Sequence, residues 1–138
     1  MNIILADTGG LYSLLNRRDE HHAEAMTFYN SLPRQTEIVI VEYILLETMT
    51  LLRARGFSNL AVQFRETLPT SQIFMLHYST PELEQATFDV FRRYADKEWS
   101  YADCALLATA NVLNTLLIFS FDHHIDQMGL QRTPTMSR

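Results

Sequence analysis

The sequence has little cysteine, glycine or proline, and it has no long apolar run. The single cysteine, Cys104, excludes an internal disulfide framework and cannot form a thiolate zinc site by itself. Four glycines and four prolines, with a hydrophobic fraction of 47%, argue against a disordered chain. No stretch reaches the roughly 20 apolar residues of a membrane span, and "MNIILAD" lacks the basic start of a signal peptide. We therefore expect a cytoplasmic protein with no membrane partner.

Basic residues are also fewer than acidic ones. The chain has 11 Lys and Arg against 16 Asp and Glu, so its formal net charge is −5. A nucleic-acid-binding domain usually has a basic surface, which argues against that function class. The objection is weaker if some acids are metal ligands, because removing four carboxylates changes the net charge from −5 to −1.

Hydrophobic patterning predicts one α/β domain over residues 1–138. Apolar runs rich in β-branched residues predict strands at 2–6, 37–41, 72–77 and 116–121, with a short last strand at 130–133. Helices are predicted at 9–17, 20–32, 42–55, 81–94 and 101–114, with a further one beginning at Ser58. Continuously apolar strands separated by helices are typical of a parallel sheet that is covered on both faces.

Two aspartates follow buried strands. Asp7 comes directly after the first predicted strand, and Asp122 comes directly after the fourth. Ligands of open α/β sheets bind beyond the carboxyl ends of the strands, so the two carboxylates share a crevice if these strands are neighbours. The alternative for Asp7 is a purely structural role as the N-cap of the next helix.

Two further acids lie on predicted helices. Glu47 interrupts an apolar helix and has Tyr43, Ile44 and Leu51 as its neighbours at helical spacing, so we expect it on the core side. An ionised carboxylate there is costly unless it is paired or bound to a cation. The alternative is a boundary residue that bonds an arginine such as Arg17.

The fourth acid, Asp103, fits a capping box. "SYAD" places Ser100 at the N-cap and Asp103 three residues on, which is a structural role, although a carboxylate in the first helical turn can also face a crevice. If all four acids converge, two carboxylates about 4 Å apart repel by roughly 4 kcal/mol at an effective dielectric near 20, so the cluster needs a cation. Oxygen ligands select Mg²⁺ or Mn²⁺ over zinc.

The stretch "FDHHID" contains other candidate ligands. Adjacent helical residues point about 100° apart, so His123 and His124 are poorly placed to bind one ion together. We expect Asp122 to be the metal-site residue of this stretch, and the roles of Asp126, His123 and His124 stay open.

Four segments in order resemble PIN-domain ribonucleases, and in size and layout the VapC-type toxins of bacterial toxin–antitoxin pairs. These are "ADTGGLYSLLNRRDEHHAEA", "VIVEYILLETMTLLRARG", "RYADKEWSYADCALLATA" and "FSFDHHIDQMGLQRTP", which together span nearly the whole chain. The resemblance implies a three-layer α/β/α sandwich with a central, mostly parallel sheet of four or five strands. It also implies an endoribonuclease that uses Mg²⁺ or Mn²⁺ to hydrolyse single-stranded RNA, leaving 5′-phosphate and 3′-hydroxyl ends.

The same resemblance implies which residues form the site. The family's acidic residues, both catalytic and metal-binding, fall on Asp7, Glu47, Asp103 and Asp122. The hydroxyls of Thr8 and Ser120 fall on positions that support these acids or contact substrate. Apart from the resemblance, Arg17, Arg18, Arg53 and Arg55 are candidate phosphate contacts, and the alternative is that they are exposed arginines that only interact with solvent.

Partners and rival functions follow from the same reasoning. A toxin implies a small antitoxin encoded nearby, and family members are commonly homodimers, for which the apolar helices around residues 43–64 are a candidate interface. The alternatives are a PIN-fold RNA-processing nuclease outside a toxin system and a non-catalytic PIN-fold protein-binding module. A haloacid dehalogenase-type phosphatase needs a second Asp two positions after the first, where this chain has Gly9. We expect Phe88 to face the core, and Trp99 and Tyr101 to pack beside the start of the last long helix.

Overall fold

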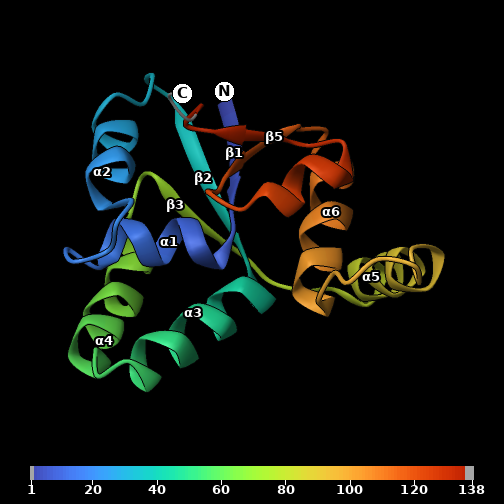
Figure 1. Ribbon diagram of the computed structural model, residues 1–138, viewed down its shortest axis with the longest axis horizontal. Helices are drawn as coiled ribbons and strands as arrows, with labels where there is room; N and C mark the ends of the chain where they lie inside the picture. Colours follow the sequence, from blue (N-terminus) through green and yellow to red (C-terminus); the bar gives the residue numbers. More distant parts are fainter. Residues whose placement is uncertain (1, 136–138) are drawn as a thin grey trace.

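A central sheet of five parallel strands organises the domain (Figure 1). The computed structural model describes residues 2–135. The strands are β1 (Asn2–Ala6), β2 (Thr36–Val41), β3 (Phe74–His77), β4 (Leu117–Phe119) and β5 (Gln131–Thr133). Their order across the sheet is β3-β2-β1-β4-β5, so β2, β1 and β4 lie in the interior.

Helices connect the strands and cover both faces of the sheet. They are α1 (Thr8–Leu15), α2 (His22–Asn30), α3 (Glu42–Ala54), α4 (Ser58–Thr67), α5 (Pro81–Arg93) and α6 (Tyr101–Leu113), with short 3₁₀ helices η1 (Leu68–Thr70) and η2 (His123–Met128). In Figure 1, α1 to α4 lie on one side of the strands, and α5 and α6 lie on the other. Right-handed crossovers give this arrangement, because the chain moves from β1 outward to β3 and then returns past β1 to β4.

The core forms where the inner strands meet the helices. Leu5, Ile38 and Ile40 are fully buried, and so are Leu106 on α6 and Phe119 on β4. Helix α6 is apolar around almost its whole circumference because it packs between the sheet and α5. A helix buried over most of its length is held firmly against the sheet, and this fixes the position of its first turn.

The predicted architecture is confirmed. Each predicted strand is present, the sheet is parallel throughout, and helices lie on both faces, as in a three-layer α/β/α sandwich. Among the strands, the largest difference in bounds is at β4, predicted over 116–121 and observed over Leu117–Phe119. Beyond Phe119 the chain leaves the sheet and enters η2. The Asp122 N–H donates a hydrogen bond to the Ser120 hydroxyl, and Asp122 is the N-cap of η2. Within residues 2–135, no helix is long and apolar enough to cross a membrane.

Candidate active site

The predicted site lies at the carboxyl edge of the sheet. Strands β1 and β4 are direct neighbours, with Ala6 beside Phe119, so the residues that follow them come together as the sequence predicts. The N-terminal ends of α1, α3 and α6 all point toward this edge, below the strands in Figure 1. Helix N-termini carry partial positive charge and free N–H groups, which favours anionic groups at this place.

Asp7 is the most buried of the four acids, with 7% of its surface exposed. It is the N-cap of α1, and one carboxylate oxygen accepts a hydrogen bond of 2.7 Å from the backbone N–H of Gly10. The other oxygen accepts a short hydrogen bond from the hydroxyl of Ser120, which is fully buried. Asp7 is therefore the N-cap of α1 and also lies at the edge where ligands of open α/β sheets bind, so one role does not exclude the other.

Gly10 permits this close approach of α1 to β4. A β-carbon at position 10 would clash with the carbonyl oxygen of Phe119 and would lie 3.2 Å from an Asp7 carboxylate oxygen. The first turn of α1 therefore packs directly on the backbone that leads to Ser120. Glycine at this position is required by packing, and it keeps the two ends of the neighbouring strands together.

The pKa of Asp7 is raised from 3.8 to about 6. Burial is the main cause, and the nearby negative charges of Asp122 and Asp103 raise the pKa further. The hydrogen bonds from Ser120 and Gly10 oppose this shift. Three of the four predicted acids, from β1, α6 and the β4–η2 turn, are thus close enough to interact through their charges.

Asp103 and Asp122 both begin helices. Asp103 forms the predicted capping box, in which it accepts the Ser100 N–H at 3.0 Å while its own N–H donates to the Ser100 hydroxyl at 3.1 Å. Asp122 is the N-cap of η2, and its N–H donates to the Ser120 hydroxyl at 3.0 Å. These local bonds fix both carboxylates beside Asp7 and leave each with an oxygen that can face a ligand.

The position of Glu47 differs from the expectation. The sequence placed it on the core side of its helix, but the side chain is exposed, because α3 turns Ile44, Leu45 and Thr48 inward instead. The alternative, a boundary residue that bonds an arginine, is not observed either, since Glu47 accepts a 2.8 Å hydrogen bond from the Thr8 hydroxyl. Thr8 directly follows Asp7, so this bond links Glu47 to the same edge of the sheet.

The structure assigns roles to two of the open residues in "FDHHID". The side chain of Asp126 accepts hydrogen bonds of 3.0 and 3.2 Å from the guanidinium of Arg132, which is a structural pair between η2 and β5. His124 contacts the carboxylate of Asp122 twice. Its backbone N–H donates a hydrogen bond of 2.9 Å to one carboxylate oxygen, and its ring Nδ1 lies 3.0 Å from the same oxygen. His123 is exposed.

The acids fit a hydrated divalent ion better than a fully protein-ligated one. Within residues 2–135, no three Asp, Glu, His or Cys side chains are close enough to hold one ion together. Mg²⁺ usually keeps several waters and takes only one or two carboxylates directly, so this spacing suits it. Among the ion pairs of the described residues, none joins a Lys or Arg to any of the four acids. The negative charge of these carboxylates is therefore available to a bound cation.

A cluster beside the site was not predicted from the sequence. Glu84 on α5 accepts hydrogen bonds of 2.5 Å from Tyr43 on α3 and 2.7 Å from Tyr101 on α6. The two tyrosine rings also meet edge to face, with centroids 5.6 Å apart. The cluster joins three helices where α3 and α6 approach each other. The sequence did not indicate this cluster, because Glu84 lies in the first turn of a helix, where an acid commonly interacts only with the helix dipole.

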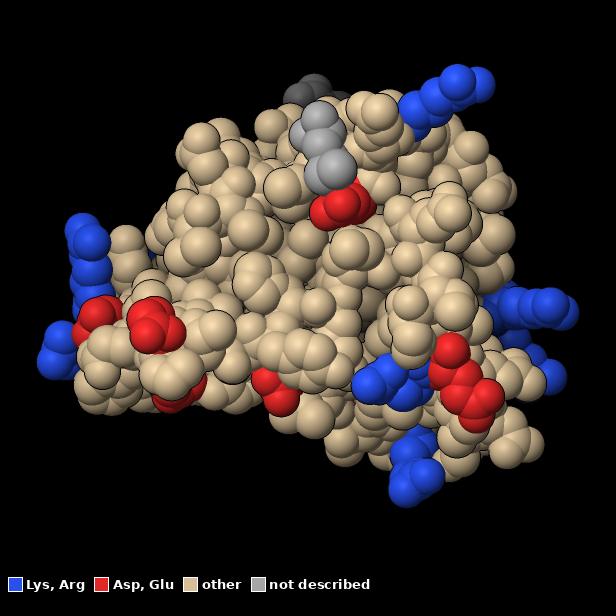
Figure 2. Space-filling model, turned by 180° about the vertical axis from the view of Figure 1, so that it is seen from behind, with Lys and Arg blue, Asp and Glu red and all other residues tan. Residues whose placement is uncertain are grey.

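Basic side chains are scattered over the surface. Arg17, Arg18, Arg53 and Arg55 are all exposed, and Arg55 lies over the ring of Tyr12 at 5.4 Å. On the face that Figure 2 shows, Lys and Arg side chains of the described residues stand apart near the edges, interspersed with acids. Attraction of a polyanion therefore depends on local groups and not on a broad basic stripe.

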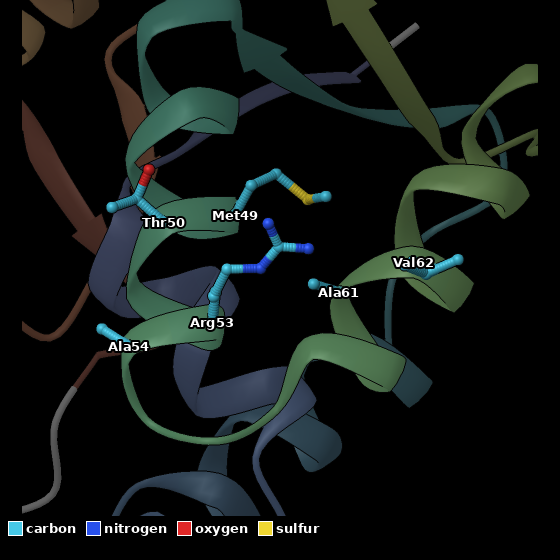
Figure 3. Close-up of a pocket in the computed structure, with 6 residues that line it drawn as sticks. All are labelled: Met49, Thr50, Arg53, Ala54, Ala61 and Val62. Atoms are coloured by element: carbon cyan, nitrogen blue, oxygen red, sulfur yellow. The ribbon is translucent and has the colours of Figure 1, made fainter.

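A pocket of about 380 Å³ lies away from the acids, between α3 and α4 (Figure 3). It is lined by Met49, Thr50, Arg53, Ala54, Ala61 and Val62. Met49 and Arg53 point across the gap toward α4 in Figure 3. Leu46 and Val62, on the same two helices, are 56% and 45% exposed. This apolar surface is unsuited to phosphate chemistry and suited to contact with another protein.

The fold and the acidic edge define a parallel α/β domain with neighbouring carboxylates at the carboxyl ends of its strands. The chain matches the PIN domain family over residues 4–130 and belongs to that family. Among solved structures it is similar to the Mycobacterium tuberculosis toxin VapC20, described as cleaving the sarcin-ricin loop, with a TM-score of 0.84 and 24% identity over 93% of this chain and 96% of that one. A comparison with curated protein sequences found no match.

Proposed function

We propose that this protein is a Mg²⁺- or Mn²⁺-dependent endoribonuclease that hydrolyses phosphodiester bonds of single-stranded RNA. The observation that carries the proposal is the convergence of Asp103 and Asp122 on the buried carboxylate of Asp7, without a Lys or Arg ion pair among the described residues. Membership of the PIN domain family supports it. Such a cluster is costly unless a cation binds there, and an oxygen-ligated cation is suited to phosphate chemistry.

Asp7 and Asp122 are the proposed direct ligands, and Asp103 and Glu47 complete the site through water. A divalent ion held by these carboxylates would supply polarisation of the phosphate and activation of a bound water. Ser120 and the Gly10 N–H hold the Asp7 carboxylate in one orientation, because each occupies a different oxygen. Thr8 orients Glu47. Arg17 and Arg18 follow α1 and are exposed, so they are available to contact RNA phosphates.

The test is cleavage of single-stranded RNA with and without Mg²⁺ by the wild type, Asp7→Asn and Asp122→Asn. We expect both variants to lose activity by at least about 100-fold, the scale of removing one strong electrostatic contribution. Glu66→Gln is the matched control, because Glu66 is an exposed acid on α4. Equal cleavage by all four proteins, or cleavage that persists in EDTA, contradicts the proposal. Calorimetry without Mg²⁺ binding favours the non-catalytic binding module instead.

We further propose that the protein is the toxin of a toxin–antitoxin pair. The similarity to a solved toxin across nearly the full length of both chains supports this role. The test is co-expression with the product of the neighbouring open reading frame. We expect the wild type to arrest growth when expressed alone, and the neighbouring protein to bind it and restore growth. Growth unaffected by an RNA-cleaving wild type favours an RNA-processing nuclease outside a toxin system.

The α3–α4 surface is the proposed homodimer contact. Exposed Leu46 and Val62 flank an apolar pocket there, and removal of such surface from water favours association. Light scattering of the wild type and Leu46→Glu tests this assignment. We expect a dimer for the wild type and a monomer for the variant. Val112→Glu is the matched control, because Val112 is 65% exposed on α6, in the other helical layer. A monomeric wild type contradicts the assignment.

A further inference from the structure

A second pocket, of about 340 Å³, lies between the end of α5 and the start of α6. Its walls include Phe88, Phe91, Arg92, Tyr94, Lys97 and Trp99. Phe88 was expected in the core, but it is 43% exposed, and Phe91 is 47% exposed. Two large aromatic side chains held at a surface are unfavourable in water, so their exposure points to a ligand that covers them.

The pocket adjoins the acidic site through the first turn of α6. Cys104 lines the pocket and directly follows Asp103, so the two features lie on adjoining sides of one helical turn. Tyr101 provides a second connection, because its ring meets that of Phe91 with centroids 5.4 Å apart. The pocket and the acids are therefore close to each other through the first turn of α6.

Two exposed cations, Arg92 and Lys97, also line the pocket. Arg92 pairs with Asp89 at 3.0 Å and Lys97 pairs with Asp96 at 3.7 Å. Both pairs are largely exposed and weakly held, so a phosphate can replace either acid as partner. Arg92 uses one N–H group in its pair, and a guanidinium has five.

Aromatic faces combined with exposed cations match the chemistry of single-stranded nucleic acid. Bases stack on aromatic rings, and the adjoining phosphates pair with Arg and Lys. An apolar peptide would use the rings but would leave the cations with their present acidic partners. With a net charge of −5, the protein needs such local cations if it is to hold a polyanion. RNA is therefore the occupant that accounts for both the aromatic rings and the cations of the pocket.

We propose that the pocket between α5 and α6 binds an unpaired base of the RNA strand next to the phosphate being cleaved. The base packs against Phe88 and Phe91, and Arg92 and Lys97 bind the phosphates on either side. This subsite rests on the proposed ribonuclease function, which it deepens by assigning where the strand lies beyond the acids. It predicts a requirement for at least one unpaired nucleotide beside the cleavage point.

Trp99 provides a direct reporter, because it lines the pocket and is the only tryptophan of the chain. The full chain is titrated in EDTA with a short single-stranded oligoribonucleotide that carries a fluorescent label. Label anisotropy measures binding, and Trp99 emission measures occupation of the pocket. We expect both signals to change with the same Kd. Binding seen by anisotropy without a change in Trp99 emission, or no binding at all, overturns the inference.

Variants then separate stacking from charge. Phe91→Ala and Phe88→Ala each raise Kd by roughly 5-fold or more, the size of one lost base stack. Arg92→Gln and Lys97→Gln each lower the slope of log Kd against log salt by about 0.7, as expected for one lost phosphate contact of a single strand. The controls are Leu116→Ala and Arg34→Gln, exposed residues before β4 and β2 at the opposite edge of the sheet. Equal effects of controls and pocket variants overturn the inference.

Cleavage assays with Mg²⁺ distinguish the subsite from the proposed function. Phe91→Ala raises KM and leaves kcat unchanged, because the stack is equally strong before and during the reaction. If the wild type cleaves and Phe91→Ala has an unchanged KM, the ribonuclease proposal stands and the subsite is wrong. If nothing cleaves but RNA still changes Trp99 emission, the proposed function fails and the subsite stands as an RNA-binding pocket. Circular dichroism of each variant confirms that it is folded.

Discussion

The hydroxyl of Ser120 donates a short hydrogen bond to the carboxylate of Asp7, although 113 positions separate the two residues in the chain. The hydroxyl oxygen of Ser120 also accepts a hydrogen bond of 3.0 Å from the backbone N–H of Asp122. One buried side chain thereby connects the acids that follow β1 and β4. Because the bond favours the ionised form of Asp7, it opposes the effect of burial on the pKa and keeps the carboxylate available to a cation.

Removal of this hydroxyl tests its effect on Asp7. In Ser120→Ala, we expect the pKa of Asp7 to rise above its present value of about 6, because the hydrogen bond that lowers it is lost. The acidic limb of the pH profile of RNA cleavage moves to higher pH, so the loss of activity is larger near pH 6 than in mildly alkaline solution. The measurements are the carboxyl carbon NMR titration of Asp7 and the pH dependence of kcat/KM.

Ser13→Ala is the control for that substitution. Ser13 is also buried, and its hydroxyl donates to Asp19 at 2.8 Å, away from the acidic edge. The two variants lose the same chemical group from a serine–aspartate bond. A shift of the cleavage profile in both, or an unchanged Asp7 titration in Ser120→Ala, is inconsistent with a specific role of Ser120.

Neutralisation of Asp7 should stabilise the protein when no metal is present. The native pKa of about 6 lies above the unfolded value of 3.8, so the native state retains a proton that the unfolded state releases. The stability associated with this group is complete below about pH 4 and is lost as the pH rises through about 6. In EDTA above pH 6, Asp7→Asn is therefore more stable by about 2 to 3 kcal/mol.

Thermal unfolding from pH 4 to pH 8 measures this effect. We expect the Tm of Asp7→Asn to exceed that of the wild type by roughly 5 to 10 °C at pH 8, with the difference disappearing toward pH 4. Mg²⁺ raises the Tm of the wild type and not of the variant, because only the ionised carboxylate binds the ion. A variant that is less stable at every pH would show that Asp7 is mainly a structural cap.

The sequence predicted the strands, helices and parallel sheet because each is encoded locally. Short apolar runs such as 37–41 are typical of buried strands. The side chains of Thr80 and Ser100 cap the helices that follow them and so mark where these helices begin. Three of the four acids also follow from local position, since Asp7 follows β1, Asp122 is the N-cap of the short helix after β4, and Asp103 lies in the first turn of α6. Their mutual approach depends only on β1 and β4 being neighbours.

Contacts between helices were beyond local patterns. Glu47 was expected to face the core, because apolar residues surround it in the helical sequence, but α3 is partly exposed and turns that side to solvent. Phe88 was misplaced for the same reason, as α5 packs on α6 with another face. The bonds of Tyr43 and Tyr101 to Glu84 depend on the relative rotation of three helices, which periodicity within one helix does not determine.

The tyrosine pair on Glu84 gives a prediction independent of activity. The carboxylate accepts a hydrogen bond from each hydroxyl, and these bonds raise the pKa of Tyr43 and raise that of Tyr101 to about 12. In Glu84→Gln, we expect the pKa values of two of the six tyrosines to fall toward 10, seen by absorbance titration of tyrosinate. Hydrogen exchange in the first turn of α6 should also quicken, because one link to α3 and α5 is weakened.

Glu82→Gln is the matched variant for that experiment. Glu82 lies in the same first turn of α5, and among the described residues no tyrosine hydroxyl bonds to it. Its tyrosine titration should therefore follow the wild type. An unchanged titration in Glu84→Gln would mean that the two hydrogen bonds do not form in solution.

The two adjacent glycines of α1 should respond very differently to a methyl group. In Gly10→Ala, the added carbon would clash with the carbonyl oxygen of Phe119, so α1 and β4 must move apart, at a cost of about 1 to 3 kcal/mol in the free energy of unfolding. In Gly9→Ala, the nearest atom is an Asp7 carboxylate oxygen at 3.7 Å, an ordinary contact. Alanine also favours a helix over glycine by about 1 kcal/mol, so this variant is equally or more stable.

Urea unfolding of both variants measures the difference, and Mg²⁺ calorimetry relates it to the site. We expect Gly10→Ala to lose Mg²⁺ affinity together with stability, because the separation of α1 from β4 stretches the bond between Ser120 and Asp7. Gly9→Ala should bind Mg²⁺ as the wild type does. Equal stability of the two variants would show that the corner between β1 and α1 relaxes without cost. Lost stability with unchanged Mg²⁺ affinity would show that the acids hold their positions without that corner.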